Sequence, residues 1–172
     1  MADHARRIGA DAPLLRAFEA MSMDERWLLR SPETMLATFH WYAGEGFDLV
    51  VEDLRALRRA DPATPLLVEG FRLLPDLVAP LAVPGAAVWL LPTPRFREAA
   101  LASRGGTWTV VGTTSDPPRA LTNLLARDAL FTDRLRRDCG RLGLPALEVD
   151  LDQSEEMLPA RVEVALGLRP PG

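Results

Sequence analysis

The sequence contains no lysine, and all 20 of its basic residues are arginine. A lysine Schiff base, a catalytic lysine and the lysine of a phosphate-binding loop are therefore excluded within these 172 residues. Cysteine occurs once, at Cys139, which excludes an intramolecular disulfide and a metal site built from several thiolates. The two histidines, His4 and His40, do not have the spacing of zinc ligands with that cysteine, and we expect no zinc site.

Excess positive charge and long hydrophobic runs are also missing. The net charge is −4 and the isoelectric point is about 5.2, so we expect no broad electrostatic binding to nucleic acid or to an anionic membrane. No stretch approaches the ~20 apolar residues of a membrane span, and residues 1–7 have no apolar run that would begin a signal peptide. These features predict a soluble, cytoplasmic protein.

Apolar residues make up 48% of the chain and charged residues 26%, which predicts a packed core. The length predicts one domain covering residues 1–172, without repeats. Residues 1–60 are expected to be mainly helical, because apolar residues recur at helical spacing, for example from Phe47 to Leu57. Residues 65–172 are expected to contain the sheet.

Helix starts are marked by local capping patterns. Ser22 followed by Glu25 three residues later is a capping box, and Ser31-Pro32 places proline at a first helical position. Asp116-Pro117 begins the longest expected helix, which ends before Gly143.

Three short apolar runs, 65–70, 86–91 and 146–150, have no polar face, as is typical of strands buried on both sides. They alternate with helical segments, which predicts an α/β fold with a parallel sheet and helices on both faces. Three strands make the predicted sheet incomplete.

Ligands of open α/β sheets bind outside the carboxyl ends of the strands, so the residues that end each run are candidates. Glu69 follows the first run and could hold a metal-bound water or accept a proton; alternatively it caps the next turn. Asp150 ends the third run and is expected to start the loop into the final helix.

Arginines are dense after these strand ends and along the long helix. Arginine favours planar, bidentate contacts with phosphate. Arg97 and Arg104 are seven residues apart and share a helix face, as do Arg127 and Arg134, so the two pairs could clamp a polyphosphate. Arg72 follows the first strand end. The alternative is that a chain without lysine uses arginine for its ordinary surface charges.

The N-terminal cluster contains an acid beside basic groups, namely Asp3, His4, Arg6 and Arg7. Such a cluster could supply a base and a phosphate anchor, or it could be a frayed terminus.

Nearly the whole chain resembles the P-loop kinases, in the branch of small nucleoside and nucleotide kinases. Three stretches carry the likeness: 66–70 resembles the central strand with its terminal acid and glycine, 87–94 resembles the strand that leads to the arginine-bearing lid, and 135–150 resembles the helix and strand before the C-terminal helix. The chain is also similar to a group of bacterial proteins of this class that have no assigned substrate.

The departure from that family is the phosphate loop, Gly-x-x-x-x-Gly-Lys-Ser/Thr, which is missing here. By resemblance, Met1 lies just after the second strand of the family, so the first strand, the loop and the first helix are missing. Either the reading frame starts too late or this form has lost ATP chemistry. The apolar runs 66–68 and 88–91 carry no polar substitutions, which favours the first explanation and predicts an exposed sheet edge or apolar face.

The resemblance implies ATP- and Mg²⁺-dependent phosphoryl transfer to a small phosphate-bearing or hydroxylated molecule, inactive without the loop. It implies Asp3 as the substrate-side base and Glu69 as the carboxylate for the Mg²⁺ water. Lid and phosphate contacts would come from four arginines, with Arg72 facing the substrate: Arg97, Arg104, Arg127 and Arg134. Two alternatives are a non-catalytic anion-binding or regulatory module and a subunit that completes its core as a homodimer.

Overall fold

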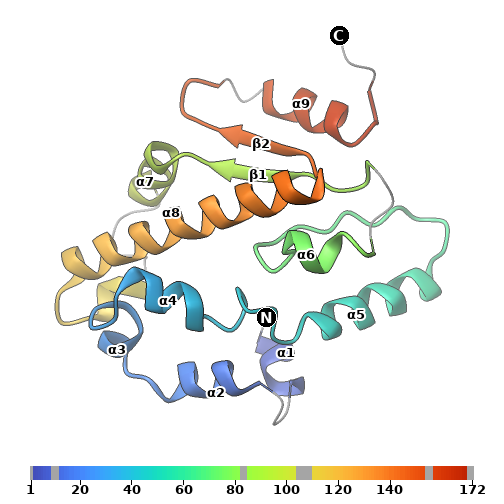
Figure 1. Cartoon of the computed structure of the whole chain (residues 1–172). Helices are drawn as coiled ribbons and strands as arrows, with labels where there is room; N and C mark the ends of the chain where they lie inside the picture. Colours follow the sequence, from blue (N-terminus) through green and yellow to red (C-terminus); the bar gives the residue numbers. More distant parts are fainter. Residues whose placement is uncertain (1, 9–11, 82–84, 104–109, 154–156, 170–172) are drawn as a thin grey trace.

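The computed structural model describes residues 2–8, 12–81, 85–103, 110–153 and 157–169. About 60% of the chain is helical, and the fold is mixed α/β with helices dominating. The elements, shown in Figure 1, are α1 (Ala2–Arg7), α2 (Pro13–Ala20), α3 (Met23–Trp27), α4 (Pro32–Thr38), α5 (Phe47–Ala60), α6 (Pro75–Val78), β1 (Trp89–Pro92), α7 (Pro94–Ser103), the 3-10 helix η2 (Val110–Thr113), α8 (Pro117–Leu142), β2 (Ala146–Val149) and α9 (Met157–Ala165).

The sheet of the described chain has two parallel strands. Trp89 of β1 lies opposite Ala146 of β2, and Pro92 lies opposite Val149. The connection between them runs through α7 and the 26-residue helix α8, and α8 packs against β1. In the view of Figure 1 the two strands lie between α8 and α9. Two of the three predicted strands are therefore confirmed, in shortened form.

The predicted strand at residues 65–70 is wrong. This segment forms neither a helix nor a strand, and no backbone hydrogen bond joins residues 65–69 to any other described residue. Leu67 is 90% exposed, and Leu66 and Val68 are also exposed. The apolar run has strand-like sequence, but a strand needs a neighbour to satisfy its backbone groups, and the described chain supplies none. The predicted parallel sheet with helices on both faces is thus reduced to two strands.

The predicted helix starts are confirmed in atomic detail. Ser22 Oγ accepts from the Glu25 amide at 3.3 Å, and the Glu25 carboxylate accepts from the Ser22 amide at 2.7 Å, which completes the capping box of α3. Asp116 accepts from the Arg119 amide at 3.2 Å at the start of α8. Gly143 ends α8 in the left-handed conformation, with φ of +66°.

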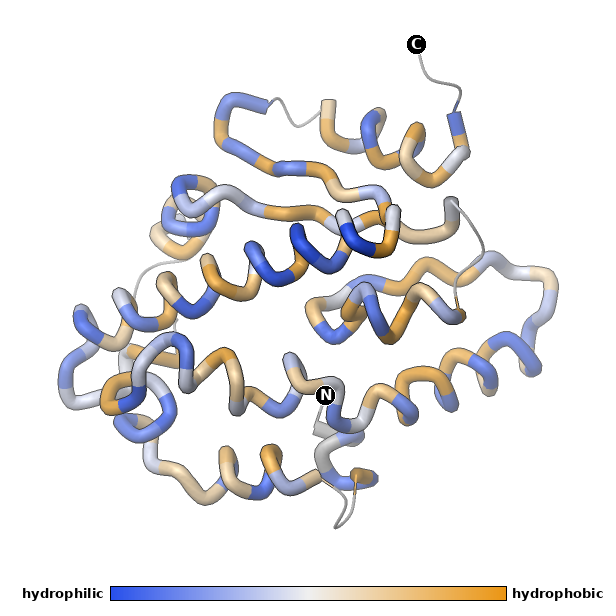
Figure 2. Tube along the Cα trace, in the orientation of Figure 1, coloured by the Kyte–Doolittle hydropathy of each residue, from blue (hydrophilic) through white to orange (hydrophobic). Residues whose placement is uncertain are grey.

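The core lies along α8. Figure 2 shows hydrophobic and hydrophilic residues interleaved along this helix, as expected of an amphipathic helix with one buried face. One cluster joins α8 to α3 and α4 through Trp27, Met35 and Leu124. A second stacks the ring of Tyr42 on Phe131, with centroids 3.7 Å apart. Cys139 is buried in a third cluster beneath β1, and burial raises the pKa of its thiol to about 11, so it is a core residue as predicted.

Other helices are less well covered. No residue of α5, α7 or α9 is buried, although α5 carries apolar residues at helical spacing. None of the described helices combines the length and the apolar character needed to cross a membrane.

The start of α2 depends on a side chain from a distant part of the sequence. Its N-cap, Ala12, has no side-chain acceptor, and Pro13 occupies the first helical position. The Glu45 carboxylate instead accepts from the Leu14 amide at 2.8 Å and from the Leu15 amide at 2.9 Å. Glu45 therefore caps α2 and places a negative charge at the positive end of the helix.

We predict that Glu45→Ala lowers the free energy of unfolding by about 1–2 kcal/mol, because two amides at the start of α2 lose their acceptor. Urea denaturation measures the effect. The matched control is Glu19→Ala, which removes an exposed carboxylate of α2 and is expected to change stability by less than about 0.5 kcal/mol. Equal effects of the two variants would contradict the capping role.

Candidate functional site

A buried ion pair on α8 forms the centre of the first candidate site. The Arg127 guanidinium donates through Nε and Nη2 to Asp128 Oδ1, at 3.1 and 2.6 Å. Both side chains are about nine-tenths buried. Arg97 of α7 approaches the other oxygen of the same carboxylate, with Nη1 3.6 Å from Asp128 Oδ2. The Asp128 carboxylate thus forms ion pairs with two guanidiniums, one from α7 and one from α8.

Aromatic rings surround the Arg127 guanidinium. Its central carbon lies 5.1 Å from the ring of Trp27, 5.3 Å from Phe39 and 5.4 Å from Tyr42, which is within the range of cation–π attraction. Arg127 Nη1 is buried and has no hydrogen-bond partner among the residues that the structure describes. Burial and the positive charge of Arg127 also lower the pKa of Arg30. Arg30 therefore lies close enough to Arg127 for the two guanidinium charges to repel each other.

A cavity of about 220 Å³ lies beside this ion pair at the carboxyl end of β1. Two arginines and three carboxylates line it together with apolar side chains such as Leu125 and Ala129; the charged residues are Arg97, Arg136, Glu98, Asp128 and Asp133. The carboxyl ends of strands are where open α/β sheets bind ligands. We call this site, made of Arg97, Arg127, Asp128 and the cavity, the β1-end site.

The structure brings together only part of the predicted arginine set. Arg97 and Arg127 meet through Asp128, as described. Arg134 instead donates to the backbone oxygen of Tyr42 at 2.9 Å and pairs with Asp138 at 3.6 Å, so its observed contacts are structural. Arg104 lies outside the described residues.

The two predicted carboxylates are not assembled with those arginines. Glu69 is exposed, and no described side chain forms a hydrogen bond or ion pair with it. Asp3 lies in α1, but its side chain is outside the described part of the structure. Within the described residues no group of three or more His, Cys, Asp or Glu side chains could hold a metal ion, so Glu69 has no partner ligands for Mg²⁺.

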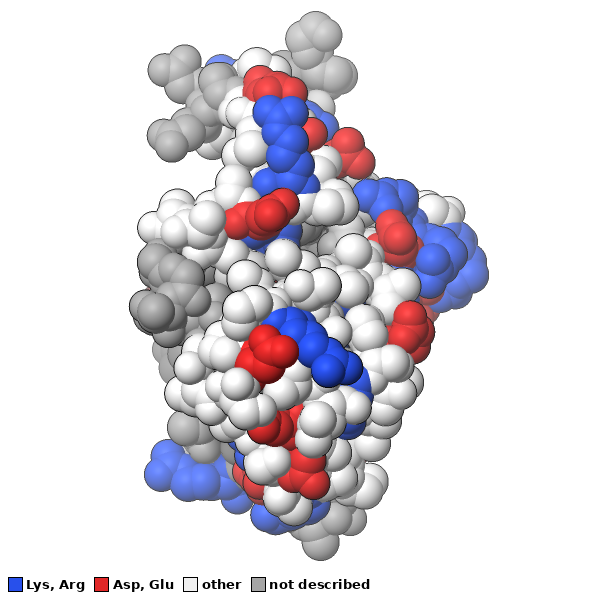
Figure 3. Space-filling model, turned by 90° about the vertical axis from the view of Figure 1, so that its left-hand side faces the viewer, with Lys and Arg blue, Asp and Glu red and all other residues white. Residues whose placement is uncertain are grey.

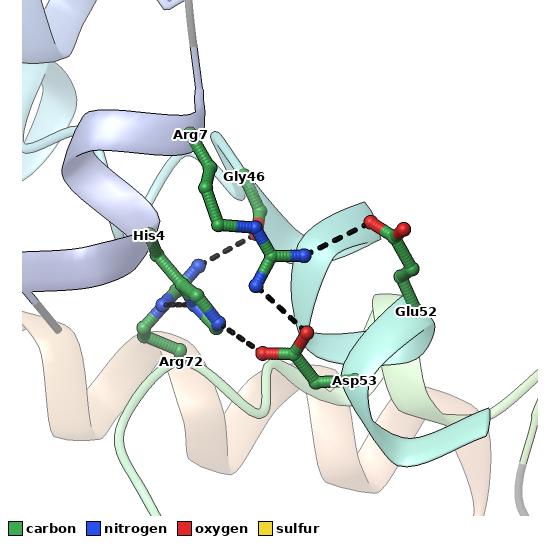
Figure 4. Close-up of polar contacts among 6 residues, drawn as sticks. All are labelled: His4, Arg7, Gly46, Glu52, Asp53 and Arg72. Carbon is green, nitrogen blue, oxygen red and sulfur yellow. Dashed lines mark hydrogen bonds and ion pairs between the residues drawn. The ribbon is translucent and has the colours of Figure 1, made fainter. Parts of the chain in front are cut away.

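A second polar cluster, drawn in Figure 4, connects α1, α5 and the segment after Gly70. His4 Nε2 lies 2.6 Å from Asp53 Oδ2, and Arg72 Nη1 lies 2.7 Å from His4 Nδ1. Arg72 Nη2 donates to the Gly46 backbone oxygen at 2.6 Å. Arg7 donates to Asp53 at 2.7 Å and to Glu52 at 3.1 Å. We call this the α1–α5 cluster.

Arginine can only donate, so the Arg72 contact requires His4 Nδ1 to be the acceptor and leaves the proton on Nε2. That proton is donated to Asp53. Hydrogen bonds from His4 and then from Arg7 hold the pKa of Asp53 below its ordinary value, so this carboxylate stays charged at neutral pH. His4 is therefore fixed in one tautomer by two oppositely charged neighbours.

Sequence reasoning identified His4, Arg7 and Arg72 but missed Asp53, which orients the histidine. Asp53 lies 49 residues from His4, on a helix where an exposed carboxylate has no distinguishing pattern. The ring of Trp41 also supports the Arg72 guanidinium at 4.1 Å, a contact without a sequence signal. The first contact depends on how α1 packs on α5, and the second on how the segment after Gly70 packs on Trp41; residue spacing reveals neither.

Charge on the visible surface is mixed. Figure 3 shows basic and acidic side chains next to one another on the face that is at the left of Figure 1.

We predict that the phenol of Tyr42 titrates at about pH 12 rather than 10, because burial raises its pKa to about 12. Since the chain has one tyrosine, the ultraviolet absorbance of phenolate reports this group alone. The folded-state pKa lies above the unfolded value, so the stability from the neutral phenol is lost as pH rises from about 10 to about 12. A midpoint near 10 in the folded protein, as in denaturant, would contradict the buried position.

We predict that Asp128→Ala lowers the free energy of unfolding by about 3–5 kcal/mol, because Arg127 and Arg97 lose their shared carboxylate within the protein. Thermal or urea unfolding measures this loss. The control is Asp133→Ala on the same helix, which removes a half-exposed partner of Arg136 and should cost no more than about 1 kcal/mol. Similar losses in the two variants would show that the Asp128 pair has no special importance.

Comparison of the chain with protein-family models, with curated proteins and with solved structures gives no match. The geometry of the two sites is therefore the basis of the function proposed next.

Proposed function

We propose that this chain carries the scaffold of a P-loop kinase-like phosphotransferase, which transfers phosphate from ATP to a small molecule when a phosphate loop is supplied from outside these 172 residues. The observation that carries the proposal is the convergence of Arg97 and Arg127 on Asp128 beside a cavity at the carboxyl end of β1. Arg97 belongs to the helix that follows β1, where the resemblance places the lid. Arginines in such a position bind phosphate oxygens and stabilise charge in phosphoryl transfer.

The exposed segment 65–70 supports the same fold. Leu66, Leu67 and Val68 are exposed, and no described strand pairs with them. The edge of β1 that does not face β2 is also without a described neighbour, and Leu90 is exposed. A strand added to these edges would satisfy their backbone groups and cover apolar side chains. This agrees with the expectation that the first strand of the kinase sheet is missing.

The described residues fit an anion better than they fit the complete MgATP complex. The chain has neither the glycine-rich loop nor the lysine that holds the terminal phosphates, and the described residues contain no carboxylate cluster for Mg²⁺. We therefore assign to this chain the arginine contacts only and derive no step that uses bound nucleotide or metal.

A non-catalytic anion-binding module is the second candidate, and the missing loop together with the isolated Glu69 favours it. In both cases the ligand is a small phosphate-bearing molecule. The two differ in what precedes Met1 in the gene and in whether Glu69 matters once the nucleotide is bound.

We predict that the 172-residue chain binds MgATP weakly and transfers no phosphate at a useful rate, because nothing in it cradles the phosphates. Thermal-shift titration with MgATP and a phosphate-transfer assay measure these properties. Arg97→Ala should abolish the residual binding, whereas Arg59→Ala, an exposed arginine on α5, should leave it unchanged. Tight MgATP binding by this chain would contradict the proposal.

The proposal is tested directly by translating the DNA that precedes the codon for Met1. We expect roughly 25–35 in-frame codons that encode an apolar strand followed by Gly-x-x-x-x-Gly-Lys-Ser/Thr, and ATP-dependent transfer by the extended chain. A stop codon close upstream would instead support the anion-binding module, in which Glu69→Gln leaves ligand binding unchanged.

A further inference from the structure

In the α1–α5 cluster, Asp53, His4 and Arg72 are hydrogen-bonded in series (Figure 4). Asp53 accepts the Nε2 proton of His4 and so turns the lone pair of Nδ1 toward Arg72. A carboxylate that fixes the tautomer in this way also strengthens the opposite nitrogen as an acceptor. His4 Nδ1 is thus an oriented acceptor, and its side chain remains partly accessible, at 16% exposure.

Arg72 has a charge that no described carboxylate neutralises directly. Its hydrogen bonds go to the Gly46 oxygen and to the neutral imidazole, and its guanidinium lies over the Trp41 ring at 4.1 Å. Asp48 is close enough to raise the pKa of Arg72, but the larger effect, burial, lowers it. Arg7 differs, because it is paired with both Asp53 and Glu52. Arg72 is therefore the cation in this cluster that is available to an added anion.

An anion would compete well for Arg72 Nη1. A charged acceptor forms a stronger hydrogen bond with guanidinium than a neutral imidazole does. The contacts with Gly46 and Trp41 would hold the rest of the side chain in place while Nη1 changes partner. His4 Nδ1, still oriented by Asp53, would then need a new donor, and a hydroxyl beside the anionic group can provide one.

We propose that His4 and Arg72 form a binding site for a small anion that carries a neighbouring hydroxyl group, with Arg72 binding the anionic group and His4 Nδ1 accepting from the hydroxyl. This inference rests on the proposed function, because it names the acceptor substrate as a hydroxylated phosphate or carboxylate. The site is separate from the β1-end site in its residues.

The test uses the 172-residue chain with ¹⁵N-labelled histidine at neutral pH and glycerol 3-phosphate as the probe. The chain has two histidines, so His40, which is buried, is an internal control. We expect His4 as the Nε2–H tautomer, and we expect the probe to shift its Nδ1 resonance saturably while the resonances of His40 stay in place. Glycerol should have no effect, and sulfate, which has no hydroxyl at neutral pH, should bind several-fold to about tenfold more weakly, as one missing hydrogen bond implies.

Calorimetric measurement of the affinity of variants for the probe shows which residue binds which group of it. Arg72→Gln should weaken the binding of glycerol 3-phosphate at least tenfold. The exposed control Arg59→Gln should leave this affinity unchanged. His4→Phe should retain sulfate binding but lose the preference for glycerol 3-phosphate over sulfate, with folding checked by the unchanged thermal transition. The inference is overturned if the probe leaves His4 unshifted, if Arg72→Gln binds as tightly as the unaltered chain, or if His4→Phe keeps the preference.

The failure of this inference can be distinguished from the failure of the proposed function. Binding that is lost in Arg97→Gln but kept in Arg72→Gln would place the anion at the β1-end site, which overturns the inference and supports the phosphotransferase. Binding that depends on Arg72 and His4, found together with a stop codon close upstream of Met1, would support the site and overturn phosphoryl transfer.

Discussion

The buried pair of Arg127 and Asp128 is the constraint on which the packing of the helical part depends. A guanidinium in the core is acceptable only if its charge is compensated, and here Asp128 and three aromatic rings provide the compensation. Those rings come from α3 and from the segment after α4, so satisfying one arginine of α8 fixes three parts of the chain against each other. Because Arg97 shares the carboxylate, α7 is held to the same place. Arg127 Nη1 is buried without a hydrogen-bond partner among the described residues, so this compensation is incomplete.

The sequence predicts the features that are local. Capping boxes, the proline at a first helical position and the glycine after α8 act within one helical turn, so Ser22, Ser31, Asp116 and Gly143 mark real boundaries. The strand at 65–70 was predicted wrongly for the opposite reason. Its composition satisfies the local requirement, but pairing is a property of a neighbour, and the described chain has none.

In the candidate sites, too, local features could be predicted from the sequence and contacts between distant segments could not. Arg97 and Arg127 could be selected from their place after a strand and on the long helix, yet Asp128, which joins them, has no signal except its position beside Arg127. Arg134 shares a helix face with Arg127 but turns to the Tyr42 backbone, because seven residues along a helix displace a side chain by about 10 Å. Asp53 and His4 meet only because α1 packs on α5. Spacing predicts which residues share a face and leaves open what that face contacts.

The aromatic segment from Phe39 to Tyr42 lies between the two candidate sites in the contact network. Trp41 supports Arg72 of the α1–α5 cluster, while Phe39 and Tyr42 face Arg127 of the β1-end site. His40 between them is buried, and burial lowers its pKa to about 4, so it stays neutral near pH 7. A neutral His40 adds no third positive charge to a segment that already has a guanidinium on each side. Acid pH reverses this, because the folded-state pKa lies below the usual value of about 6.5, and the stability from neutral His40 is lost as pH falls from there to about 4. Both candidate sites therefore contact one uncharged segment, at Trp41 for Arg72 and at Phe39 and Tyr42 for Arg127.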